Sequence, residues 1–323
     1  MMGEIFVLNA AGVSVTLYAL AAAAAALVCG GWMLRLAPRH GLGRREAALY
    51  FLLAALLALA LGRGIYCAVR WEWLFLDEMG NFAGIAPFFD AANGGVSVVG
   101  VLAGCLLAAP LTSAMTGKKA ADYLDCAALP GILLFAVIRL AEPLAGQGYG
   151  DLLLSPAFCF FPLALLNDMG DYSLSVCFIE AVLALLLWAA LLIARKRARK
   201  SGSLALYALT LLCACQVMPE SLRRDDVLFL FIFARVTQIG YAVLLCGALA
   251  FALFRGARRG LGWKQIVLEG GMMLAGVALC IGAEFALDKT NLPDILVYAV
   301  MIAALLAMAF LTCRRIYKED SLP

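Results

Sequence analysis

Residues 174–200 read LSVCFIEAVLALLLWAALLIARKRARK, and this stretch decides the fold class of the chain. Its apolar part, 174–194, holds a single charged side chain, Glu180, and a run of lysine and arginine follows it directly. A helix needs about 20 consecutive, mostly apolar residues to cross the hydrocarbon core of a bilayer. The stretch therefore predicts a membrane-spanning helix whose basic end lies on the cytoplasmic side.

Similar apolar segments recur along the whole chain. Hydrophobic residues make up 65% of the sequence and charged residues 15%, whereas soluble domains contain roughly 45–50% and 25%. We therefore predict an all-α fold, a polytopic transmembrane helical bundle of about nine spans. The expected spans are 13–34, 47–69, 96–115, 124–140, 174–194, 204–218, 228–254, 267–287 and 295–312.

The positions of the basic residues predict the orientation of this bundle. Most of the 25 lysines and arginines fall in every second connection or in the C-terminal tail. Cytoplasmic loops carry an excess of Lys and Arg, so the N-terminus is expected outside and the C-terminus inside. The first span is expected to be an uncleaved helix, because its basic residues follow it rather than precede it. The basic connections and the tail hold Arg35, Arg39, Arg44 and Arg45; Lys118 and Lys119; Arg195, Lys196, Arg197, Arg199 and Lys200; Arg255, Arg258, Arg259 and Lys264; and Arg314, Arg315 and Lys318.

Several classes of function receive no support from the sequence. No basic run is interleaved with aromatic residues, so nucleic acid is not an expected partner. The chain has one histidine, His40, in a predicted inner loop, where we interpret it as a solvated residue. Most of the eleven cysteines lie in apolar runs, where free thiols behave as small hydrophobic groups. Neither a metal nor another cofactor is therefore expected.

Charged residues at membrane depth are the main candidates for function, because burying a charge in a bilayer is costly. Most of them lie toward the predicted outer side. Two interpretations stay open: ion pairs or snorkelling side chains that stabilise the helices, or a cradle of arginines for a lipid phosphate. Arg139 and Arg223 are the best candidates for such a cradle. The full set is Arg63 in the second span, Arg139 and Glu142 at the end of the fourth, Glu180 in the fifth, Glu220 and Arg223 after the sixth, Arg235 in the seventh and Glu284 in the eighth.

Two long outer connections, 70–95 and 142–172, are rich in aromatic residues, glycine and proline. Aromatic side chains at headgroup depth are typical of an interfacial belt or arm. The glycine-rich stretches 93–97 and 146–150 have two readings: close approach of the backbone to a ligand, or a helix cap and a turn. Neither contains the pattern of a phosphate-binding loop.

These residues, in this order, resemble the bacterial prolipoprotein diacylglyceryl transferases over about residues 1–256. The resemblance divides the chain into a membrane domain, 1–256, and an additional two-helix extension, 257–323. The matching stretches are 16–20 with Tyr18, 62–66 with Arg63, the double-glycine entry 93–100, the signature segment RLAEPLAGQGYG at 139–150, the glutamate–arginine element 220–225, and Thr237 with Gln238.

The resemblance implies that diacylglycerol is transferred from phosphatidylglycerol to the thiol of a lipobox cysteine in a preprolipoprotein. The location would be the bacterial cytoplasmic (inner) membrane. The residues matched to headgroup binding are Arg139, Arg223, Tyr18, Arg63 and Gly150. Those assigned to catalysis are Glu142, Gln147 and Glu220, with Glu142 as a base if burial makes it suitable.

The sequence departs from the family pattern at several motif positions. Val99 stands where the family has a histidine, and Gln147 where it has a glutamate. Two asparagines are replaced by Glu142 and Ala145, and an arginine by Gln216. The first hypothesis is therefore a phospholipid-dependent transferase, acting on this or a related acceptor. The alternative is a catalytically inactive lipid-binding or assembly protein on the same scaffold. A transporter ranks last, because the chain has no internal repeat.

Overall fold

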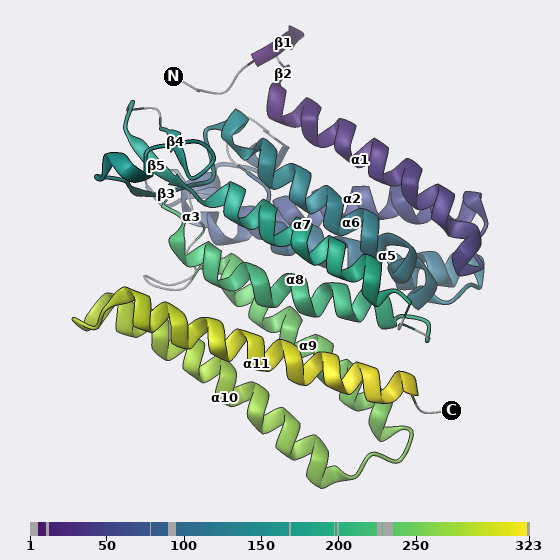
Figure 1. Cartoon of the computed structure of the whole chain (residues 1–323). Helices are drawn as coiled ribbons and strands as arrows, with labels where there is room; N and C mark the ends of the chain where they lie inside the picture. Colours follow the sequence, from purple (N-terminus) through teal and green to yellow (C-terminus); the bar gives the residue numbers. More distant parts are fainter. Residues whose placement is uncertain are drawn as a thin grey trace.

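The computed structural model describes residues 6–10, 13–77, 79–89, 95–167, 169–196, 198, 200–224, 228 and 235–321. Within these residues, nine helices are long and apolar enough to cross a membrane, which confirms the predicted helical bundle (Figure 1). They are α1 (Leu17–Leu36), α2 (Arg44–Val69), α5 (Val98–Thr116), α6 (Ala120–Ala141), α7 (Val176–Ala194), α8 (Ser203–Leu222), α9 (Val236–Ala257), α10 (Trp263–Lys289) and α11 (Asp294–Ser321). Asn93, Gly94, Arg197 and Arg199, which the sequence singled out, lie outside the described residues.

Small residues allow helices α2 and α5 to pack closely. A Cβ atom added to Gly100 would lie 2.4 Å from the carbonyl oxygen of Leu61, and one added to Gly104 would lie 2.4 Å from the backbone nitrogen of Ala58. Close backbone approach through small residues is the usual way in which helices associate in lipid, where hydrophobic burial provides little driving force. Larger residues at these two positions would push α2 and α5 apart.

The first and the seventh predicted spans begin before the observed helices, by four and by eight residues. Residues Val13–Thr16 form strand β2, and α1 begins after Thr16, whose hydroxyl accepts a hydrogen bond from the backbone N–H of Ala19 at 3.2 Å. A threonine N-cap of this kind ends the extended segment and starts the helix. Helix α9 begins at Val236, so Arg235 is its N-cap and does not lie inside the seventh span.

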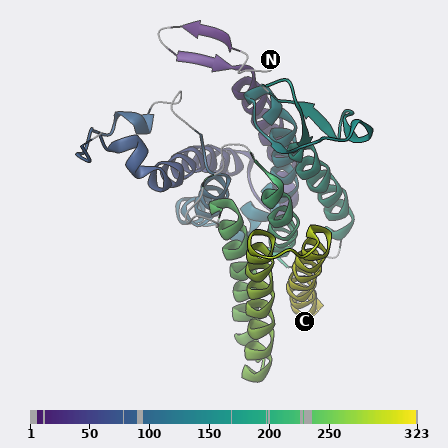
Figure 2. The ribbon, with the colours of Figure 1, turned by 90° about the vertical axis from the view of Figure 1, so that its left-hand side faces the viewer.

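Short strands, absent from the prediction, form two small sheets at the end of the bundle where α1 begins (Figures 1 and 2). Strand β1 (Phe6–Ala10) pairs antiparallel with β2 (Val13–Thr16). Strand β5 (Tyr172–Ser175) lies between β3 (Tyr149–Leu152) and β4 (Ala164–Leu166), antiparallel to both. The second sheet leads directly into α7 and therefore fixes where that helix starts.

The outer connection after α2 forms an aromatic arm, which comprises helices α3 (Trp71–Phe75) and α4 (Ala86–Phe89) and stands out to one side of the bundle (Figure 2). The Asp77 carboxylate accepts hydrogen bonds from the backbone N–H groups of Asn81 and Met79, at 2.8 and 2.9 Å, which lower its pKa. The aromatic character agrees with the predicted interfacial arm. An apolar pocket of about 260 Å³ in the arm is lined by Trp71, Phe75, Phe82, Ile85, Phe88 and Phe89.

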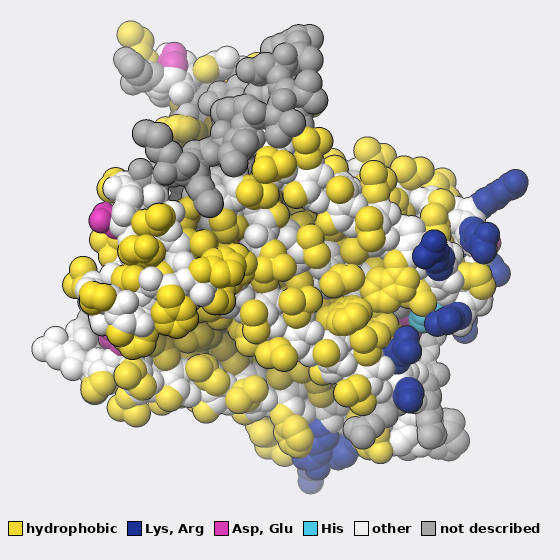
Figure 3. Space-filling model, turned by 45° about the horizontal axis from the view of Figure 1, so that its top comes forward, with side chains coloured by type: hydrophobic (Ala, Val, Ile, Leu, Met, Phe, Trp, Pro, Cys, Tyr) yellow, Lys and Arg dark blue, Asp and Glu magenta, His cyan; other side chains and the backbone are white. Residues whose placement is uncertain are grey.

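Helices α10 and α11 pack against α8 and α9 and continue the same core. Tyr241, Leu245 and Leu249 of α9 belong to one buried apolar cluster with Met301 and Leu305 of α11. Apolar side chains also cover much of the outer surface of the bundle, while Lys and Arg gather at one end (Figure 3). This distribution is typical of a membrane protein with one strongly basic face.

Candidate functional site

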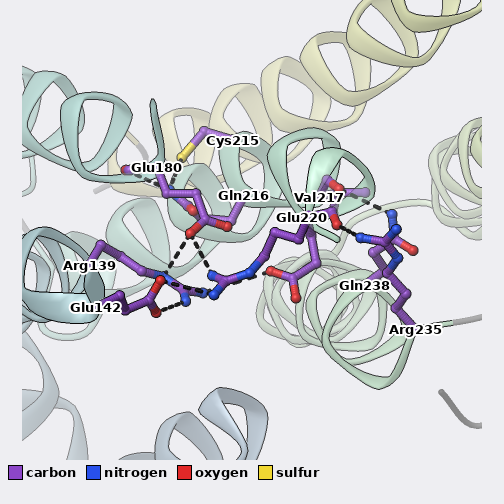
Figure 4. Close-up of polar contacts among 10 residues, drawn as sticks. Arg139, Glu142, Glu180, Cys215, Gln216, Val217, Glu220, Arg235 and Gln238 are labelled. Carbon is purple, nitrogen blue, oxygen red and sulfur yellow. Dashed lines mark hydrogen bonds and ion pairs between the residues drawn. The ribbon is translucent and has the colours of Figure 1, made fainter. Parts of the chain in front are cut away.

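The candidate site lies where α6 and α8 end and α7 and α9 begin (Figure 4). Arg139 occupies the last turn of α6, and Glu142 opens the following 3-10 helix η2 (Glu142–Ala145). Glu180 lies near the start of α7, while Glu220 and Arg223 lie at the end of α8. A cation near a helix C-terminus is stabilised by the helix dipole, so helix polarity favours the arginine positions.

Two carboxylates connect the two arginines. The guanidinium of Arg223 forms an ion pair through Nη2 with Glu142 Oε2 and donates from Nη1 to Glu180 Oε2, each at 3.0 Å. Arg139 pairs through Nη1 with Glu142 Oε1 and through Nε with Glu180 Oε2, the latter at 3.1 Å. Its Nη2 also lies 3.8 Å from Glu220 Oε2. Two guanidiniums and three carboxylates therefore form one continuous network.

Every member of this network is buried, and Glu180 is not exposed at all. Removing one partner from a buried ion pair leaves the other charge uncompensated, which typically costs about 3–5 kcal/mol. The oxygens Glu180 Oε1, Glu220 Oε2 and Gln216 Oε1 have no hydrogen-bond partner among the described residues. Arg139 Nε, Arg139 Nη2 and Glu142 Oε2 lie at ion-pair distance from opposite charges but likewise form no hydrogen bond among the described residues. The network thus keeps spare donors as well as spare acceptors.

Hydrogen bonds hold the end of α8 and the start of α9 beside this network. Gln216 Nε2 donates to the Glu180 carbonyl oxygen at 3.2 Å, and Arg235 donates to the carbonyl oxygen of Glu220. Gln238 donates to Glu284 of α10 at 2.8 Å and lies 3.4 Å from the carbonyl oxygen of Val217. Figure 4 shows the contacts of Arg235 with Glu220 and of Gln238 with Val217.

Glycines in the segment after Glu142 permit tight packing against α7 and α8. Gly148 has φ +90°, a conformation that L side chains rarely adopt, and a Cβ atom there would lie 2.4 Å from the Cβ of Cys177. A Cβ atom on Gly150 would lie 2.8 Å from Val176 Cγ2 and 2.9 Å from the Leu222 carbonyl oxygen. The turn and packing interpretation of residues 146–150 therefore accounts for these glycines.

The family model of the prolipoprotein diacylglyceryl transferases matches residues 6–254, which include every residue of the ion network. The chain belongs to this family. No curated protein matches it. The match ends within α9, so in this diacylglyceryl transferase family member α10 and α11 lie beyond the matched range.

The remaining predicted site residues of this transferase family member lie in different surroundings. Tyr18 is within electrostatic reach of Glu142, Arg139 and Arg223. Arg63 donates to the carbonyl oxygens of Pro87, Phe88 and Gly95, at 2.6, 3.0 and 3.2 Å. The side chain of Gln147 is exposed. The structure thus brings Tyr18 to the network, whereas Arg63 attaches the aromatic arm to α2.

Val99, which we expect at the position of the family's histidine, has an apolar neighbour. A Cβ atom built on Gly240 of α9 would lie 2.2 Å from Val99 Cγ2. Within the described ranges, no group of three or more His, Cys, Asp or Glu side chains is arranged to hold a metal ion.

Sequence reasoning missed one polar group of the network. Tyr241 is fully buried in α9 and lies within electrostatic reach of Arg139, Glu220 and Glu180. Its hydroxyl has no hydrogen-bond partner among the described residues. The signal available in the sequence was its spacing, one helical turn after Gln238, which puts both side chains on one face of α9.

Proposed function

We propose that this chain transfers diacylglycerol from phosphatidylglycerol to the thiol of a lipobox cysteine in the bacterial cytoplasmic membrane. One observation supports the proposal above the others: Arg139 and Arg223 approach closely enough for a single carboxylate to bridge them. A lipid phosphate presents its oxygens in a similar way and forms strong, charge-assisted hydrogen bonds with guanidinium groups. Tyr18, near the same two arginines, adds a hydroxyl group to the proposed headgroup site.

The reaction balances as a substitution at carbon. The acceptor sulfur forms a bond to the glyceryl carbon, and the bond from that carbon to the phosphate oxygen breaks. The electron pair leaves with the phosphate, which departs as glycerol phosphate, and the thiol proton passes to a carboxylate. Arg139 and Arg223 would stabilise the charge on the departing phosphate, because prearranged cations favour developing negative charge in a site without water.

Glu142 is the proposed recipient of the thiol proton. Binding of phosphate to the two guanidiniums would release the carboxylate oxygens of Glu142 from their ion pairs. A carboxylate can act as a general base when it lies within hydrogen-bond distance of the proton that it removes. Glu220, whose Oε2 lacks a hydrogen-bond partner among the described residues, is the second acidic candidate.

A transfer assay tests this function directly. The purified protein, in vesicles that contain phosphatidylglycerol, would receive a peptide with a lipobox cysteine, and mass spectrometry would detect added diacylglycerol. We expect product from the unchanged protein and at least about a 100-fold loss with Arg139→Gln, the scale seen when a group that stabilises transition-state charge is removed. Arg224→Gln is the matched control, because the Arg224 side chain forms a half-exposed ion pair with Asp151 and donates to the carbonyl oxygens of Ser221 and Arg223, outside the ion network.

A second candidate function, a non-catalytic lipid-binding or assembly protein, is supported by Val99. An isopropyl group in the place of an imidazole cannot accept a proton, and it packs against Gly240. Phosphatidylglycerol that remains bound to a protein which yields no product in the assay would favour this alternative. Product that disappears with Arg139→Gln and persists with Arg224→Gln would reject it.

A further inference from the structure

Glu142 occupies the position between the two guanidiniums. Its Oε1 pairs with Arg139 Nη1, and its Oε2 lies 3.0 Å from Arg223 Nη2. The 3-10 helix η2 fixes this geometry, with Pro143 in its first turn and Gly146, at φ +66°, as its C-cap. The Glu142 side chain is buried. Its carboxylate therefore serves as an internal anion that compensates the positive charges of Arg139 and Arg223.

Glu180 holds the same two arginines from the other side. It pairs with Arg139 through Nε at 3.1 Å and with Arg223 through Nη1 at 3.0 Å. Each guanidinium therefore presents one nitrogen to Glu142 and a different nitrogen to Glu180. If Glu142 withdrew, both arginines would keep a buried carboxylate partner and their positions, and two nitrogens, Arg139 Nη1 and Arg223 Nη2, would face an incoming ligand.

The two carboxylates differ in how readily they can move. Glu180 is fully buried within α7, flanked on both sides along the chain by regular helix. Glu142 follows the end of α6, in a four-residue 3-10 helix that leads into the exposed Gln147. Segments at helix ends reorganise at lower cost than helix interiors. Glu142 is therefore the exchangeable partner and Glu180 the permanent one.

We infer that Glu142 is an internal anion which occupies the headgroup site, and that a phosphate ligand binds by displacing it. The inference rests on the proposed function, in which phosphate binds to Arg139 and Arg223. A lipid phosphodiester carries one negative charge, the same as the carboxylate that it displaces. The exchange therefore leaves the net charge around the two arginines nearly unchanged. A free phosphate monoester carries about −1.5 to −2 at pH 7, so it competes better than the lipid headgroup.

The test compares phosphate binding by the full chain and by Glu142→Gln, which removes the charge and keeps the shape. In one arm, glycerol phosphate would be titrated into the protein in phosphatidylcholine nanodiscs by calorimetry. In the other, nanodiscs with increasing fractions of phosphatidylglycerol would be analysed for lipid that copurifies with the protein. We expect tighter binding in both arms, by at least about fivefold, the lower end of typical coupling between binding events. The unchanged protein should prefer glycerol phosphate, and Glu142→Gln should keep that preference, because both ligands displace the same carboxylate.

Two further variants make the result specific. Asp151→Asn removes a carboxylate from the half-exposed pair with Arg224 and should leave both affinities within about twofold of the unchanged protein. Glu142→Asp keeps the charge but shortens the side chain by one methylene, and should tighten binding less than Glu142→Gln. If Glu142→Gln does not fold, the Glu142→Asp comparison decides alone.

The outcomes separate this inference from the proposed function. Equal or weaker phosphate binding by both Glu142 variants, with binding by the unchanged protein intact, would overturn the inference and leave the transferase proposal standing. Tighter binding by the variants of a protein that transfers nothing would support the inference and overturn the transferase proposal. Absence of phosphate binding in every variant and both arms would overturn both.

Discussion

Val99 of α5 packs against Gly240 of α9. A substitution at Gly240 would therefore show whether the Val99 side chain fills the space between the two helices. A methyl group added to Gly240 would lie 2.2 Å from Val99 Cγ2 and 2.9 Å from its Cβ. Because overpacking a tight contact typically costs about 1–3 kcal/mol, we expect Gly240→Ala to lower the thermal stability of the protein in detergent by several degrees. Adding Val99→Ala should restore most of the loss, because it removes the opposing methyl groups.

Gly247→Ala, in the same helix, is the matched control for this prediction. A Cβ atom on Gly247 would meet nothing within 4 Å, and alanine is a better helix former than glycine by about 1 kcal/mol. The control should therefore be neutral or slightly stabilising. A Gly240→Ala protein as stable as the unchanged one would mean that Val99 does not fill the space beside α9, and the apolar account of this position would be wrong.

Single residues also show how far the sequence alone could predict the site. The cost of burying charge indicated that Arg139, Glu180 and Arg223 matter together, and the structure brings them within ion-pair distance. The sequence left two interpretations open, and the observed network supports internal ion pairing, with phosphate binding still a proposal. Which carboxylate meets which guanidinium depends on the rotation of α6, α7 and α8 about their axes, which hydropathy does not encode.

Among the elements, the existence of the long helices was easier to predict than their ends. Span length and apolar composition follow from the thickness of the bilayer, so nine segments were recognisable. Strands β3, β4 and β5 were not, because each has only three or four residues and their pairing connects positions as distant as Tyr149 and Ser175. The start of α9 was also missed, since hydropathy does not register the N-cap position of Arg235.

Helices α10 and α11 are expected to stabilise the family domain by packing rather than to form a separate unit. Met301 of α11 is fully buried in the cluster that includes Tyr241 and Leu245 of α9. We expect Met301→Ala to cost roughly 2 kcal/mol, the low end for buried methionine, because lipid is nearly as apolar as the core. Thermal unfolding in detergent or in nanodiscs would measure this loss.

Leu306→Ala is the corresponding control on the same helix, because the Leu306 side chain is 65% exposed. Its truncation should change stability by less than about 0.5 kcal/mol. Equal effects of Met301→Ala and Leu306→Ala would mean that α11 is not held against α9 in the membrane. In that case the division at residue 257 would mark an independent pair of helices.

The molecule as a whole has two chemically different ends. The ion network, the two sheets and the aromatic arm lie at one end, and the basic connections lie at the other (Figures 1 and 3). At the basic end, Ser203 Oγ donates to Asp320 Oδ1 and Lys200 Nζ to the carbonyl oxygen of Glu319, both at 2.6 Å. These contacts fasten the C-terminal part of α11 to the start of α8. The extension is therefore part of the basic end.

The separation of the two ends predicts that the C-terminus is cytoplasmic and that the site faces the outer side. A reporter tests this, because green fluorescent protein fluoresces only when fused on the cytoplasmic side and alkaline phosphatase is active only outside. We expect fusions after Pro323 to fluoresce and to lack phosphatase activity, since basic residues are retained inside. Fusions after Leu154, which is 93% exposed and lies between α6 and α7, should give the opposite result. Phosphatase activity at the C-terminus would move Arg139 and Arg223 to the cytoplasmic leaflet, where the thiol of an exported lipoprotein precursor could not meet them after translocation, and the transferase proposal would fail with the orientation.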